Sequence, residues 1–124
     1  MAAPNIVNVT SIFGFTTTIA LTTTAGTVLL ANATSSGAVF KINTILASNV
    51  DGTNDGAVTI AYNSQAGGAG TSTELASTIT VPADATLVVL GKDTSFYLEE
   101  NRSIVGNANA ASTIEVLISY ESIN

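Results

Sequence analysis

The sequence predicts an all-β protein: one antiparallel β-sandwich domain, jelly-roll-like, with about eight strands over residues 1–124. Three observations predict this class. Apolar residues recur at every second position, which is the period of a half-buried strand. Turn-forming clusters of Gly, Asn, Asp and Pro return about every ten residues. Val, Ile and Thr are abundant, and their branched side chains pack well on a pleated sheet.

The clearest strand covers residues 113–121, "TIEVLISYE". Ile114, Val116, Ile118 and Tyr120 point to one side of this strand, and mostly polar residues point to the other. Leu117 interrupts the polar side, so we expect another chain to cover part of that face.

The remaining strands are predicted from shorter alternating or continuous apolar segments. In "VFKINTILAS", Phe40, Ile42, Thr44 and Leu46 are expected to share one face. Residues 1–14 are expected to form either an arm that adds a strand to a neighbouring molecule or an ordinary edge strand. The other predicted strands lie within residues 16–24, 26–33, 57–62, 77–82, 86–91, 95–100 and 102–106.

Composition excludes several classes of function. The 124 residues include no Cys and no His, so disulfides, thiolate zinc sites and Ser-His or Cys-His dyads are excluded. Three basic residues stand against nine acidic ones, and the net charge of −6 repels nucleic acid and anionic membranes. We therefore expect neither as a partner.

The low total charge suggests a surface that other protein covers. Only 10% of the residues are charged, where a soluble domain usually has about a quarter. Such a surface suits a molecule packed against copies of itself or other subunits; the alternative is a highly expressed domain with a neutral surface. The loops 51–55 and 67–70 are candidate contacts, and so is Arg102, because Arg is enriched at interfaces. The full set of interface candidates is Pro4, Ile6, Val7, Phe13, Phe15, Arg102 and Leu117.

The stretch "DGTNDGAVTIAY" resembles the start of a calcium-binding EF-hand loop, with Asp51, Thr53 and Asp55 at alternate positions before Gly56. However, Tyr62 stands where the EF-hand requires its bidentate glutamate, and the loop leads into a predicted strand instead of a helix. A turn between strands is therefore predicted, and neither a metal nor a cofactor is expected. A cation site at Asp51, Asn54 and Asp55 is the minor alternative.

No catalytic set emerges from the sequence, so the protein is not expected to be an enzyme. Glu99 and Glu100 are adjacent and point to opposite faces of a strand, so they cannot form an acid/base pair alone. A carbohydrate-binding role would need exposed aromatic side chains. The chain has no Trp, and only Phe13, Phe15 and Tyr97 are expected to face outward.

Three segments carry a family resemblance over roughly residues 38–122: "VFKINTILASNVDGTNDGAVTI", "LASTITVPADATLVVLGKDTSFYLEENRSI" and "STIEVLISYESI". They resemble the small virion structural proteins of tailed bacteriophages, especially those of marine and cyanobacterial phages. The "YLEE" segment departs from the family pattern, because Asn101 and Arg102 follow it where a Gly and an acidic residue are usual.

The resemblance implies a β-sandwich protein of the virion without enzymatic activity. The leading hypothesis is a capsid decoration (cement) protein, made in the host cytoplasm and bound to the outer capsid surface. It would be a homotrimer that clamps subunits of the major capsid protein. A tail, neck or fibre component of the same virion is the alternative. A carbohydrate-binding β-sandwich module is a second alternative.

Overall fold

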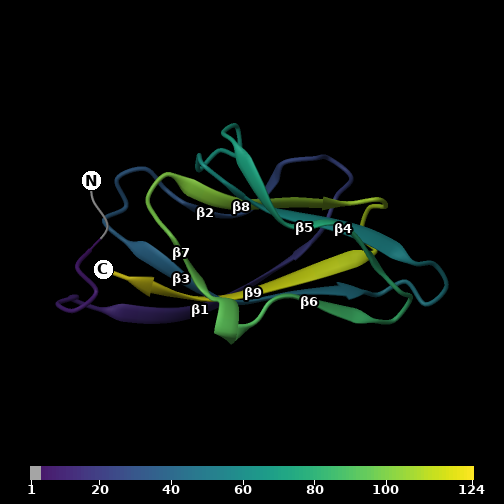
Figure 1. The fold of residues 1–124 in the computed structure, drawn as a ribbon, viewed down its shortest axis with the longest axis horizontal. Helices are drawn as coiled ribbons and strands as arrows, with labels where there is room; N and C mark the ends of the chain where they lie inside the picture. The colour runs from purple at the N-terminus through teal and green to yellow at the C-terminus, as the bar shows by residue number, and fades with distance from the viewer. Residues whose placement is uncertain (1–3) are drawn as a thin grey trace.

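A computed structural model, which describes residues 4–124, contains nine strands in two antiparallel sheets. The two sheets form the two layers visible in Figure 1. The predicted β-sandwich is therefore confirmed, with nine strands where about eight were expected. Within residues 4–124 the only helical element is the short turn η1 (Lys92–Thr94), and no helix there is long and apolar enough to cross a membrane. The strands are β1 (Ile12–Ala20), β2 (Thr27–Asn32), β3 (Val39–Asn49), β4 (Gly56–Asn63), β5 (Ser72–Val81), β6 (Thr86–Leu90), β7 (Phe96–Leu98), β8 (Arg102–Ala108) and β9 (Ile114–Ile123).

The strand order is that of a jelly roll. The five-stranded sheet has the order β1-β9-β3-β6, and β7 pairs with β3 beyond the end of β6. The four-stranded sheet has the order β2-β8-β4-β5. With the short β7 set aside, eight strands remain in two sheets of four, as in a jelly roll. The chain crosses between the sheets repeatedly, so segments distant in sequence meet in one core.

The core forms where the inner faces of the two sheets meet, and β9 shows the predicted alternation. Ile114, Val116 and Ile118 are buried, while Glu115 between them is exposed. From the opposite sheet, Ile60 of β4 and Ile104 of β8 are completely buried in the same cluster.

The prediction that Phe40, Ile42, Thr44 and Leu46 share one face of β3 is wrong for the last two residues, because the strand contains a β-bulge. Ile42 pairs with Tyr120 and Thr44 pairs with Ser119, so Asn43 is an extra residue on β3. The extra residue reverses the alternation. Phe40 and Ile42 face the core, but Thr44 and Leu46 face outward, and the fully buried Ile45 and Ala47 replace them.

The N-terminal segment continues the β1–β9 pair before it turns away. The backbone N–H groups of Thr10 and Ser11 donate to the carbonyl of Asn124, and the N–H of Asn124 donates to Ser11. Of the predicted arm or edge strand at residues 1–14, residues 12–14 belong to the edge strand β1. Residues 1–3 lie outside the described part of the chain.

Two buried asparagines tie the sheets together at opposite ends of the sandwich. At the end of β2, the Asn32 Nδ2 donates to the carbonyl of Leu98 in the other sheet at 3.0 Å. At the end of β3, the Asn49 Nδ2 donates to the carbonyl of Val81 in the other sheet at 2.9 Å and to the carbonyl of Asn54 at 2.9 Å. Both side chains are almost completely buried, so water cannot replace these bonds at low cost.

We expect Asn49→Ala to lower the free energy of unfolding by about 2–4 kcal/mol, because it leaves two carbonyls and the Asp51 N–H without their partner. Urea denaturation measures the change. The matched control is Asn54→Ala in the same loop, whose exposed side chain should cost less than about 1 kcal/mol. Equal losses in the two variants would contradict the role given to Asn49.

Candidate functional site

The outer face of the five-stranded sheet carries a row of uncharged side chains from four neighbouring strands. Thr18 of β1 lies opposite Leu117 of β9, Leu117 lies opposite Leu46 of β3, and Leu46 lies opposite Val88 of β6. We call these four residues the outer row. Val88 is 61% exposed, and both leucines are half-buried although they point away from the core. The sequence predicted Leu117 but missed Leu46, because the bulge at Asn43 could not be anticipated.

A shallow hollow of about 310 Å³ deepens one flank of the outer row. Leu117 and Thr18 line it together with Val50, which is 50% exposed, and Ser48. Glu115 is its one charged lining residue. The outer row and this hollow form a continuous patch in which large apolar side chains meet solvent, a feature typical of interaction surfaces.

The predicted N-terminal contact residues lie at the other end of the same sheet. Pro4 and Ile6 line a hollow of about 230 Å³ with Val39 and Tyr97. Ile6 is 52% exposed and Val7 is 91% exposed. In this arrangement the segment packs on its own domain, with two apolar side chains left at the surface.

Aromatic side chains gather at the β1 edge of the five-stranded sheet, on its inner side. Phe13 and Phe15 have ring centroids 6.5 Å apart, and Phe15 stacks on Tyr120 of β9 at 5.6 Å. Phe40 of β3 continues the cluster at 5.0 Å from Tyr120. Phe13 and Phe15 are 55% and 49% exposed, and Tyr97 is also exposed, as the sequence predicted.

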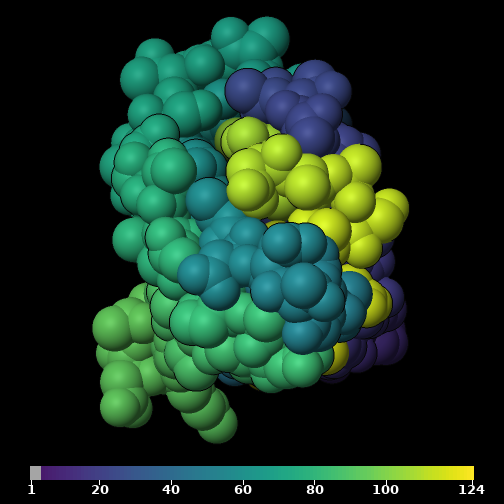
Figure 2. Space-filling view, turned by 90° about the vertical axis from the view of Figure 1, so that its right-hand side faces the viewer, coloured from purple at the N-terminus to yellow at the C-terminus, as the bar shows by residue number. Residues whose placement is uncertain are grey.

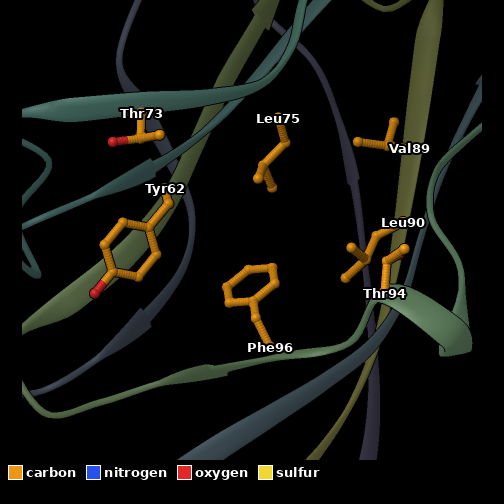
Figure 3. A pocket seen from close by; sticks show the side chains of 7 residues that line it. All are labelled: Tyr62, Thr73, Leu75, Val89, Leu90, Thr94 and Phe96. Carbon is orange, nitrogen blue, oxygen red and sulfur yellow. The ribbon is translucent and has the colours of Figure 1, made fainter.

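An apolar cleft opens between the sheets on the side of the sandwich opposite β1 (Figure 3). It has a volume of about 530 Å³ and lies between β5 and the β6–η1–β7 segment. In Figure 3, Leu75 and Phe96 point toward each other across it, and the rings of Tyr62 and Phe96 meet edge to face at 6.0 Å. This cleft could not be predicted from the sequence, because its lining comes from four separate strands and a turn. The lining residues are Tyr62, Thr73, Leu75, Val89, Leu90, Thr94 and Phe96.

The loop that resembles an EF-hand lies at the end of the sandwich that Figure 2 faces. There the loop before β4 lies beside the turn before β9, and the Val50 N–H donates to the Thr113 carbonyl at 2.9 Å. Asp51 accepts from the N–H groups of Thr53 and Asn54 at 2.8 and 3.2 Å, and from the Asn54 side chain at 3.2 Å. These bonds form the turn expected from the sequence.

The other features of this loop also fit a turn better than a cation site. Asp55 accepts a hydrogen bond from the N–H of Ala83, whereas Asp51 accepts from Thr53 and Asn54, so the two carboxylates have different partners. Within residues 4–124, no three His, Cys, Asp or Glu side chains lie close enough to hold a metal ion together. Hydrogen bonds from the backbone of Thr53 and Asn54 hold the pKa of Asp51 below its ordinary value.

Arg102, another predicted interface residue, makes internal contacts. One guanidinium nitrogen donates to the carbonyls of Ser64 and Asn101, both at 3.0 Å. The hydroxyl of Ser103 donates to the Gln65 carbonyl at 2.7 Å. Together with the buried Asn63, which binds the carbonyls of Gly68 and Gly70, these bonds fix the glycine-rich loop between β4 and β5.

The chain matches no protein-family model, and no curated protein matches it.

We expect the Asp51 turn to loosen in acid. Because the folded-state pKa of Asp51 lies below the ordinary value of 3.8, the turn is stabilised above that value, and the stabilisation is lost as pH falls through the folded-state pKa. Hydrogen exchange of the Thr53 and Asn54 amides measures the loss as falling protection. Asp51→Asn should remove this dependence on pH. Unchanged protection of both amides in acid would contradict the assignment.

Proposed function

We propose that the protein is a structural protein of a tailed-bacteriophage virion, namely a capsid decoration protein that binds the outside of the assembled major capsid lattice. The resemblance over residues 38–122 supports the class of protein. The observation that carries the proposal is the outer row, an uncharged line of side chains across four strands of a rigid sheet. Such a row can contact a shell through uncharged side chains, with Glu115 at its flank as the nearest charge.

The proposed contact is apolar because the exposed residues are apolar. Each buried methylene contributes about 0.8 kcal/mol, so covering Val88, Leu46 and Leu117 gives a modest contact for each copy. Modest contacts suffice here, because a protein that binds the assembled lattice but not its free subunits stabilises the lattice in proportion to RT ln(1 + [L]/Kd) at every site. Many equivalent sites multiply this effect over the shell.

The remaining features fit the same role. We propose a homotrimer without enzymatic activity, located on the outer capsid surface after synthesis in the host cytoplasm. The net charge of −6 disfavours contact with the packaged nucleic acid and favours a position outside the shell. The exposed Ile6 and Val7, with the half-buried Pro4, supply a second apolar contact at the other end of the sheet.

Copy number in purified virions tests the location. A decoration protein is present at every equivalent lattice position, whereas a tail, neck or fibre component is present at one unique position of the particle. Quantitative mass spectrometry should therefore give a copy number of this protein in a fixed ratio to that of the major capsid protein, with both numbers of the same order of magnitude. A copy number far below that of the major capsid protein would favour a tail or neck location. Absence of the protein from the particle would contradict the proposal.

We expect Val88→Glu and Leu117→Glu each to weaken binding to particles stripped of this protein by at least about tenfold, because each places an unpaired charge in an apolar contact. Co-sedimentation of purified protein with such particles measures the affinity. The control is Thr80→Glu, which adds the same charge at an exposed position of the other sheet. Equal binding by all three variants would exclude the outer row as the contact.

A further inference from the structure

We propose that copies of this protein associate head to tail, with the β1 edge of one copy seated in the apolar cleft of the next. The inference deepens the proposed homo-oligomer, on which it rests, by assigning the two surfaces that meet. The first is the β1 edge with Phe13 and Phe15. The second is the cleft between β5 and the β6–η1–β7 segment.

The two surfaces lie on opposite sides of the same sandwich. β1 ends the five-stranded sheet on one side, while β6 and β7 end it on the other, next to β5. A contact between unlike surfaces on opposite sides is heterologous, so repeated contacts close into a ring or continue as a filament. This geometry can build a trimer, which a two-fold contact between identical β1 edges cannot.

The shapes of the two surfaces are complementary. About half of Phe13 and half of Phe15 are exposed, and both side chains lie on the side of β1 that faces the space between the sheets. A cavity of about 150 Å³ is enough to bind benzene. The cleft, at about 530 Å³, has room for both phenyl rings, and Leu75, Val89 and Phe96 supply apolar walls for them.

Backbone groups can add to this contact. β1 pairs with β9 on one side, and among residues 4–124 no strand pairs with its other side. β5 pairs with β4 and likewise has a free edge along the cleft in the described chain. Free strand edges present unpaired N–H and carbonyl groups that readily pair with another chain.

The charge distribution is compatible with contact between these two surfaces. Copies with a net charge of −6 repel each other, so association is least costly where neither surface is charged. Residues 12–20 contain no charged side chain, and none of the residues that line the cleft is charged. Added salt should therefore strengthen the association by screening the repulsion, whereas it would weaken a contact made of ion pairs.

The contact area predicts a weak association. The nine-residue strand β1 is about 30 Å long. If one edge and one face of β1 contact the cleft of the next copy, each partner buries on the order of 450 Å². The total lies below the range of about 1,200–2,000 Å² for stable complexes. Association should therefore be weak and concentration-dependent in solution, and should become firm where several contacts close a ring.

Sedimentation equilibrium of the purified full-length chain tests the proposal. The wild type should gain mass as its concentration rises. Phe13→Ser/Phe15→Ser damages the β1 edge, and Thr73→Glu places a charge at the exposed rim of the cleft. Each should raise the dissociation constant at least about tenfold. Thr80→Glu, on the same strand as Thr73 but outside the cleft, should associate like the wild type.

Mixing the two damaged variants is the decisive measurement. The mixture should form a heterodimer, because one intact β1 edge and one intact cleft remain between the two chains. Phe13→Ser alone, which keeps the stack of Phe15 on Tyr120, replaces the double variant if circular dichroism shows that the double variant is unfolded.

Three outcomes would overturn the proposal. They are a monomeric wild type at every concentration, a Thr73→Glu variant that associates like the wild type, and a mixture that stays monomeric while the wild type associates. The second outcome would instead indicate a two-fold contact between β1 edges. Because these measurements use purified protein alone, they are independent of the virion and particle-binding experiments. A monomeric wild type would remove the homotrimer but leave the proposed binding to the capsid to be decided by those experiments.

Discussion

The structure depends on two buried asparagines that tie the sheets at both ends of the sandwich. Hydrophobic burial holds the layers together but is non-directional, so it does not fix how one sheet lies on the other. Asn32 and Asn49 do so, because each donates from the end of a strand in one sheet to a carbonyl in the other. Their burial makes these bonds costly to break, and the position of one sheet over the other follows from them.

This fixed placement explains why the two lateral sides of the sandwich differ. On one side, the aromatic residues of β1 project on the inner face of the five-stranded sheet and remain half exposed, so the opposite sheet does not cover them fully. On the other side, β5 and the β6–η1–β7 segment stay far enough apart to leave the apolar cleft. The Asn32 and Asn49 bonds oppose a lateral shift of one sheet over the other, so both apolar sides keep this geometry.

Local pattern predicted the strands, and long-range geometry decided the rest. The alternation in β9 was clear because no bulge interrupts its sequence, so Leu117 could be assigned to the outer face in advance. On β3, the extra residue Asn43 shifted Leu46 to that same face, and no feature of the sequence marks such an insertion. The cleft was invisible for a different reason: Tyr62, Leu75 and Phe96 meet only through the crossovers of the jelly roll.

Strand alternation lets β1 take part in both proposed contacts without conflict. Thr18 points outward and contributes to the outer row, whereas Phe13 and Phe15 point to the opposite face. A copy seated on a shell by its outer row therefore still presents its aromatic edge sideways to the next copy. Under the proposed arrangement, contact with the shell would hold neighbouring copies at high local concentration, so a lateral contact that is weak in solution would become effective there. Both faces of β1 would be covered in that arrangement, which fits a strand that contains no ionised side chain.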